Sequence, residues 1–65
     1  MLDVQGMMVA EQLNSLLDQE RQAAKLAAEL AGQVSDESSR RQLEEMHRDK
    51  LRHVQLVERL LEILE

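Results

Sequence analysis

Four polar side chains interrupt the apolar faces of this chain, and their types could do chemistry. At about 100° per residue on a helix, Glu20 lies at the centre of one apolar face and Lys50 at the centre of another. His53 and His47 flank Lys50 at about 60° on either side. A carboxylate and imidazoles can bind metals or move protons, whereas an ammonium only donates hydrogen bonds. These four residues define the candidate site.

Two structural explanations compete with a functional one. A buried charge is costly unless it is paired or bound to a metal. Lys50 could extend its ammonium to the edge of a helical bundle while its methylene groups pack inside. Glu20 could set the helix register, as a single buried asparagine does in some coiled coils. The sequence leaves both explanations open.

The composition predicts that helices position these groups. Ala, Glu, Lys, Leu and Arg supply 35 of the 65 residues, and proline is absent, which is typical of long helices and coiled coils. We predict one all-α domain, residues 1–65, with helices over about residues 9–31 and 36–64 and a turn at residues 32–35.

The ends of the helices carry further signals. Gly32 is expected in the left-handed conformation just after the first helix. Ser35 is expected to cap the second helix through its hydroxyl. Residues 1–6 are expected to form a frayed or loosely docked arm.

Each predicted helix carries a broad apolar face with three- and four-residue spacing, typical of a left-handed bundle. These faces comprise Val9, Leu13, Leu16, Leu17, Ala23, Ala24, Ala27, Leu30 and Ala31, and then Leu43, Met46, Val54, Val57, Leu60, Leu61 and Leu64. Two helices cannot cover both faces, so we expect an antiparallel hairpin that dimerises into a four-helix bundle. Leu26, Leu51 and Leu56 lie off these faces and either broaden the contact or are ordinary exposed leucines.

The antiparallel hairpin brings the polar residues to one level. Glu20 lies fourteen residues before Val34, and Lys50 and His53 lie sixteen and nineteen residues after it. A dimer places two copies of this set in the middle of the bundle. We therefore predict a buried polar cluster of Glu20, Lys50 and His53.

Two segments resemble the half-site of ferritin-like and rubrerythrin-type di-iron carboxylate bundles, which combine a helix 1 glutamate with Glu-x-x-His in helix 2. Leu16-Leu17-Asp18-Gln19-Glu20-Arg21-Gln22-Ala23-Ala24 is similar to the first helix of the family, with Glu20 at the bridging-ligand position. The second helix is matched by Arg48-Asp49-Lys50-Leu51-Arg52-His53, followed by Leu56-Val57-Glu58-Arg59-Leu60. The resemblance covers roughly residues 10–62 and implies a ferritin-like four-helix bundle.

Lys50 departs from the family pattern, because it stands where the family has the glutamate of Glu-x-x-His. A complete two-fold site holds four glutamates and two neutral histidines, so two divalent ions balance its charge. Two copies of Glu20 and two of Lys50 sum to zero without a metal. We therefore expect Glu20–Lys50 pairs in place of a metal bridge, no cofactor and no enzymatic activity.

The alternative is a metal-binding protein with iron or another divalent metal. Its ligands would be Glu20, His53 and His47, and ferroxidase-type activity is the enzymatic form of this alternative. Glu44 precedes His47 at Glu-x-x-His spacing, but it lies about 120° from the centre of the apolar face and should face solvent. Such a site requires Lys50 to move away or lose its proton.

Charge and composition restrict the partners. A net charge of −5 argues against nucleic-acid and anionic-membrane partners. No apolar run spans a bilayer, and the first residues have no signal-peptide pattern, so we expect a cytoplasmic protein. The absence of cysteine excludes disulfides and thiolate zinc sites. We expect a self-associating homodimer or higher homo-oligomer with a structural or adaptor role. The further alternative is a regulatory hairpin that binds another protein.

Overall fold

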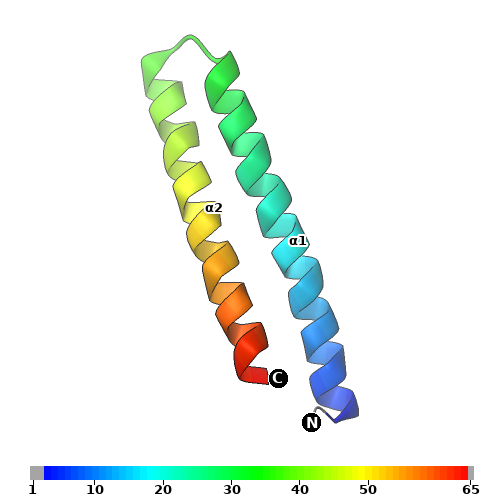
Figure 1. The fold of residues 1–65 in the computed structure, drawn as a ribbon. Coiled ribbons are helices and arrows are strands. Elements are labelled where there is room, and N and C mark those ends of the chain that lie inside the picture. The colour runs from blue at the N-terminus through cyan, green and yellow to red at the C-terminus, as the bar shows by residue number, and fades with distance from the viewer. Residues whose placement is uncertain (1–2, 65) are drawn as a thin grey trace.

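Two long helices joined by a short connection form an antiparallel hairpin (Figure 1). The computed structural model describes residues 3–64. Helix α1 spans Val4–Gln33 and helix α2 spans Glu37–Leu64. The described residues contain helices and no strand. The predicted all-α hairpin is therefore confirmed.

Helix α1 begins five residues earlier than predicted, at Val4. Asp3 precedes it as the N-cap, and its Oδ1 accepts a hydrogen bond from the backbone N–H of Gly6 at 2.6 Å. This bond satisfies one of the donors that the start of a helix leaves unpaired. The expected arm is therefore wrong for residues 4–6, which are helical, whereas Met1 and Leu2 lie outside the described residues.

The connection between the helices uses extended backbone instead of a left-handed glycine. Gly32 lies inside α1, and no residue within 3–64 has a positive φ. Helix α1 ends because Val34 is extended, with φ −83° and ψ 142°, while its N–H still donates to the Leu30 carbonyl at 3.1 Å. A β-branched side chain is compatible with extended backbone. The left-handed prediction for Gly32 is therefore wrong.

Asp36, and not Ser35, caps helix α2. Its Oδ2 accepts hydrogen bonds from the backbone N–H and from the hydroxyl of Ser39, both at 2.8 Å. The backbone bond, reinforced by the hydroxyl bond, lowers the pKa of Asp36. A carboxylate binds the N–H groups of a helix start more strongly than a hydroxyl does. This preference explains why Asp36, and not the predicted Ser35, caps α2.

The core is a thin strip between the helices. Leu17, Val54 and Val57 form a cluster, and two partly buried leucines, Leu13 and Leu61, pack against it. Nearer the turn, the buried side chains of α1 are all small, namely Ala24, Ala27 and Ala31. Even the most deeply buried of the core side chains are 4% exposed. One hairpin therefore has little interior.

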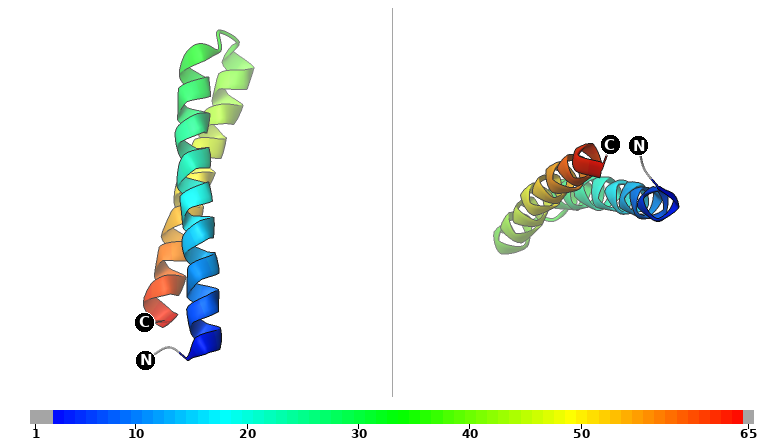
Figure 2. Two further views of the ribbon diagram at one scale, coloured as in Figure 1. Left: turned by 90° about the vertical axis from the view of Figure 1, so that its right-hand side faces the viewer. Right: turned by 90° about the horizontal axis from the view of Figure 1, so that it is seen from below.

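The hairpin is elongated, with extents of 50 × 14 × 11 Å. Figure 2 shows that the two helices are inclined to each other along this length. The turn lies at one end, and the start of α1 lies near the end of α2 at the other (Figure 1). Within residues 3–64, neither helix is both long and apolar enough to cross a membrane.

Candidate functional site

Glu20 of α1 contacts two side chains of α2. Lys50 Nζ lies 3.4 Å from Glu20 Oε2 and 3.5 Å from Oε1. His53 Nδ1 lies 3.2 Å from the same Oε2 atom. The structure thus brings three of the four candidate residues together at one point of the hairpin.

The level of this cluster follows from the helix lengths. Glu20 and Lys50 each lie fifteen residues from Ser35. At a rise of about 1.5 Å per residue, both lie about 22 Å from the turn. The long dimension of the hairpin is 50 Å, so the cluster lies near its middle.

The cluster lies at the surface of the single hairpin. The side chain of Glu20 is 15% exposed, that of Lys50 is 31% exposed and that of His53 is 50% exposed. No polar side chain within residues 3–64 is buried. Exposed ion pairs contribute little to stability, so the strength of this cluster depends on what covers it. The burial of this cluster was predicted for a four-helix bundle, and for that bundle it stays a prediction.

A mostly apolar hollow opens beside the cluster, with a volume of about 240 Å³. Leu16 and Glu20 line it from α1, and His53, Leu56 and Val57 line it from α2. Residues of both helices therefore border one shared depression. The carboxylate and the imidazole are its polar edge, and the remaining lining is aliphatic.

The hollow lies on a larger exposed face, which we call the open face. It consists of two columns at seven-residue spacing, Val9, Leu16, Ala23 and Leu30 on α1 and Met46, His53 and Leu60 on α2. Among its large apolar side chains, Leu16 is 39% exposed and Met46 is 50% exposed. Seven-residue spacing sustained along both helices is the repeat of helices that pack in bundles. The open face is therefore an apolar surface that the single hairpin leaves uncovered.

His47 lies apart from the cluster. It lines a second hollow of about 370 Å³ near the turn, together with Ala28, Ala31, Gly32, Arg40 and Glu44. On α2 it flanks Lys50 on the side opposite His53. The structure therefore does not join His47 to Glu20 and His53 in one site.

The donors of one chain do not fit a di-metal centre. An ammonium has three donors and no lone pair for a metal, and that of Lys50 is already in contact with the Glu20 carboxylate. Within residues 3–64, no three His, Cys, Asp or Glu side chains are grouped so that they could hold a metal ion. The arrangement can instead balance charge and fix the relative level of the two helices.

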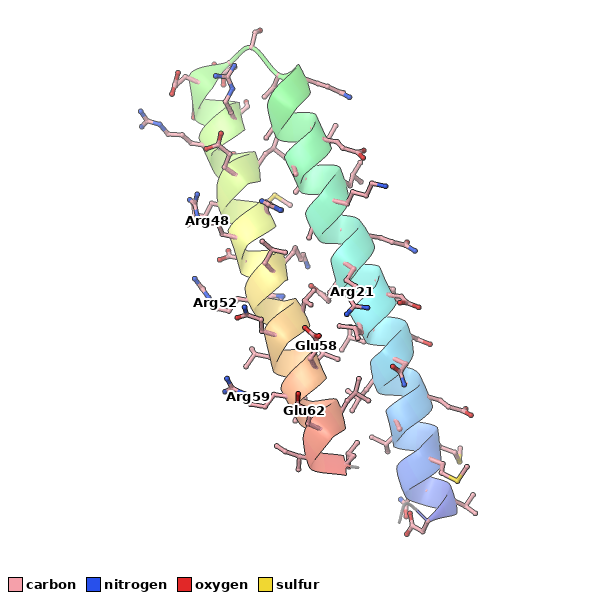
Figure 3. The ribbon with its side chains drawn as sticks, viewed as in Figure 1. Arg21, Arg48, Arg52, Glu58, Arg59 and Glu62 are labelled. Carbon is pink, nitrogen blue, oxygen red and sulfur yellow. The ribbon has the colours of Figure 1, made fainter. Side chains whose placement is uncertain are left out.

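Sequence reasoning missed two further charged features. Arg21 Nη2 lies 3.5 Å from Glu58 Oε2, and Figure 3 shows these side chains between the two helices. A row of arginines also follows α2 at spacings of seven, four and seven residues, Arg41, Arg48, Arg52 and Arg59. The last three project away from α1 (Figure 3). The spacing in the sequence was the available signal for this row.

Glu37 and Asp49 partly neutralise the arginine row. Arg41 pairs with Glu37 at 3.7 Å, and Arg52 pairs with Asp49 at 3.5 Å. All four of these side chains are at least half exposed. Such pairs are typical of a solvated helix surface, so the row is not part of the candidate site.

No family model, curated protein or solved structure matches this chain. The resemblance to ferritin-like half-bundles therefore rests on its residues alone. The hairpin geometry, the open face and the contacts of Glu20 are the observations from which a function is inferred.

Proposed function

We propose that this chain is a non-catalytic, self-associating helical-bundle protein with a structural or adaptor role. Two hairpins pair through their open faces into a homodimeric four-helix bundle of ferritin-like topology. The observation that carries this proposal is the open face itself, an apolar surface with heptad spacing along both helices.

The surface area of the chain supports a partner. The folded chain exposes 5213 Å². A compact monomer of 7.5 kDa is expected to expose about 4200 Å². The excess of about 1000 Å² is close to the roughly 800 Å² that each partner buries in a standard stable interface. A second hairpin would therefore remove an ordinary amount of surface from water.

The border of the open face on α1 also supports packing. At the next seven-residue positions, the flanking residues of α1 are uncharged, namely Gln5, Gln12, Gln19, Leu26 and Gln33. Burial of uncharged side chains avoids the large desolvation cost of charges. The α1 edge can therefore approach another helix closely.

The Glu20–Lys50 pair supports a bundle that needs no metal. A dimer brings two carboxylates and two ammonium groups to the same level, and their charges cancel. Their mutual attraction strengthens once a partner excludes water. In this proposal the pairs occupy the place that bridging metals have in the ferritin-like family.

Matched leucine variants test the proposal. Leu16 lies on the open face and is 39% exposed, whereas Leu51 lies off it and is 45% exposed. Leu16→Asp is expected to dissociate the dimer and to unfold the chain at micromolar concentration, while Leu51→Asp remains a folded dimer. Sedimentation velocity and circular dichroism measure both outcomes. Equal behaviour of the two variants would contradict the proposal.

Metal binding is the second candidate function. The contact of 3.2 Å between Glu20 Oε2 and His53 Nδ1 favours it, because it places a carboxylate and an imidazole side by side. Two hairpins would supply two such pairs. Calorimetric titration of untagged protein with Fe(II), Mn(II) or Zn(II) separates the functions. Micromolar or tighter binding by the wild type would replace the metal-free proposal.

A folded monomer would point to a third function. A hairpin that keeps its open face uncovered at high concentration would be a regulatory module whose apolar surface receives a helix of another protein. Sedimentation of the wild type across concentrations distinguishes this module from the dimer.

A further inference from the structure

We infer that copies of this hairpin also associate side by side in the same orientation, through the two polar sides of the hairpin that face away from its core. The side of α1 that points away from α2 contacts the side of α2 that points away from α1 in the next copy. The turns of neighbouring copies then lie next to each other. This contact does not use the open face, so the inference goes beyond the proposed dimer and does not depend on it.

Each helix carries a column of exposed, mostly charged residues on the side opposite its buried residues. The outer face of α1 comprises Glu11, Ser15, Asp18, Gln22, Lys25 and Glu29. The outer face of α2 comprises Arg41, Glu45, Arg48, Arg52, Gln55 and Arg59. Three of these arginines, Arg48, Arg52 and Arg59, point away from α1 in Figure 3. The two outer faces therefore lie on opposite sides of the hairpin and can meet only between copies.

The two outer faces are of opposite charge. Three carboxylates and one ammonium give the outer face of α1 a charge of −2, whereas four guanidinium groups and one carboxylate give that of α2 a charge of +3. The whole chain has a net charge of −5, so copies repel each other in most orientations. Contact between the two outer faces is an orientation in which the local charges attract instead.

The charges also match residue by residue. Both columns have alternating spacings of four and three residues, as in helices that pack along a common seam. When copies lie side by side with their turns together, residues at equal distance from Ser35 meet. Each of the four charged residues of the outer face of α1 then meets an opposite charge. The pairs are Glu11 with Arg59, Asp18 with Arg52, Lys25 with Glu45 and Glu29 with Arg41.

The two remaining levels contain no like charges. Ser15 meets Gln55, and Gln22 meets Arg48. Like-charge contacts between facing helices would oppose association. Among these twelve residues, the match therefore has four attractive levels and no repulsive one.

Ion pairs within α2 leave its arginines accessible to this contact. Arg41 is 3.7 Å from Glu37 and its side chain is 78% exposed, and Arg52 is 3.5 Å from Asp49 and 71% exposed. A guanidinium has five N–H donors, so it can bind a second carboxylate while it keeps the first. The outer face of α2 can therefore accept the carboxylates of another copy.

Lys25 and Glu45 decide the orientation of the contact. If the neighbouring copy were turned end for end, the acidic residues of α1 would still meet arginines. Lys25 would then face Gln55, and Glu45 would face Ser15. Only the arrangement with turns together gives Lys25 an opposite charge, so we assign that arrangement.

The contact joins two different surfaces, so each added copy leaves one outer face of each kind free. Such head-to-tail contacts build rings or open chains of copies. Exposed ion pairs contribute little individually and are screened by salt. The association is therefore weak and depends on ionic strength, unlike an apolar contact through the open face.

Sedimentation velocity of the wild type at two ionic strengths tests the contact. The screening length is about 30 Å at about 10 mM salt and about 3 Å at about 1 M salt. At high micromolar concentration, larger assemblies are expected in low salt and are expected to dissociate in high salt. Equal masses in both salts would overturn the inference. A single-chain mass in high salt, with larger assemblies in low salt, would contradict only the proposed dimer.

Exchange of one charge pair tests which residues meet. Lys25→Glu and Glu45→Lys each replace a favourable pair by a like-charge contact, so each should weaken the low-salt association about threefold or more. The double variant exchanges the two charges, keeps the net charge of the chain and should recover the wild-type association. Failure of the double variant to recover would overturn the assigned arrangement.

Glu44→Lys is the matched control for net charge. Glu44 borders the hollow near the turn and lies off the outer face of α2, and its substitution changes the net charge as Glu45→Lys does. The low-salt association of Glu44→Lys should equal that of the wild type or exceed it. A loss as large as that of Glu45→Lys would show that position on the helix is irrelevant and would overturn the inference.

Discussion

Glu20 Oε2 and Lys50 Nζ lie 3.4 Å apart, on facing helices and at equal distances from the turn. The ammonium and the carboxylate therefore form an ion pair between the two helices. His53 contacts the same carboxylate oxygen at 3.2 Å. Glu20 is consequently an α1 residue that contacts both Lys50 and His53 of α2.

Removal of either charge of this pair is expected to destabilise the dimer. Lys50→Met or Glu20→Gln leaves one charge without its partner in the covered bundle, which costs about 3–5 kcal/mol for a truly buried pair. The double variant should recover much of this loss. The free energy of unfolding, measured in urea for all four proteins, gives the coupling energy. Zero coupling would mean that Lys50 only extends its ammonium into solvent.

Restoration of Glu-x-x-His should create metal affinity. Lys50→Glu changes the central charge of a dimer from zero to −4, since two positive charges are replaced by two negative ones. Repulsion between the carboxylates should lower the melting temperature of the metal-free variant. Addition of Fe(II), Mn(II) or Zn(II) should raise it again through binding to the folded state. The wild type should show little response, and an equal response of both proteins would contradict the role assigned to Lys50.

Packing of the alanine segment gives a third prediction. Ala27 is 4% exposed, so Ala27→Leu should overpack the helix interface and cost about 1–3 kcal/mol. Ala28 borders the hollow of about 370 Å³ near the turn, where a longer side chain has room. Ala28→Leu is therefore the matched control and should be tolerated. Chemical denaturation compares the two, and equal stabilities would contradict the packing seen here.

The two helices could be predicted from the sequence because they depend on apolar periodicity. The equal level of Glu20 and Lys50 could be predicted because it depends on counting residues from the turn. Apolar spacing and the absence of proline indicated two helices, and counting from the turn placed Glu20 level with Lys50. The same counting assigned His53 to the cluster, although the helical angles alone do not separate His53 from His47. The two histidines flank Lys50 symmetrically, and only the side on which α1 packs decides which of them meets Glu20.

The residues that cap or end the two helices could not be predicted exactly from the sequence, because neighbouring residues have similar capping preferences. Ser35 and Asp36 both have side chains that can cap a helix. The extended backbone of Val34 ends α1, so Gly32 remains helical. Similarly, Asp3 caps α1 through a hydrogen bond from the backbone N–H of Gly6, and α1 begins at Val4. These outcomes depend on three-dimensional geometry and not on residue type alone.

Acid should remove the contribution of the Asp36 cap. Hydrogen bonds from Ser39 lower the pKa of Asp36 below its ordinary value of 3.8. The ionised carboxylate therefore stabilises the fold above this pH, and its contribution is lost as the pH falls through the lower folded-state value. Asp36→Asn cannot titrate, so the stability difference between wild type and variant should shrink below about pH 4.

Urea denaturation at several pH values measures this difference. Ser35→Ala is the control, because Ser35 does not cap α2, and it should track the wild type at every pH. A difference between wild type and Asp36→Asn that stays constant down to strongly acidic pH would contradict the role of the carboxylate.

The dependence of thermal unfolding on protein concentration tests the proposed dimer most directly. Folding and association are coupled when a hairpin with so little interior depends on its partner. Circular dichroism melts of the wild type from low to high micromolar concentration should show a melting temperature that rises steadily with concentration. Sedimentation equilibrium of the same samples should give twice the chain mass of 7.5 kDa, or a higher multiple. A folded monomer whose melting temperature is independent of concentration would contradict self-association.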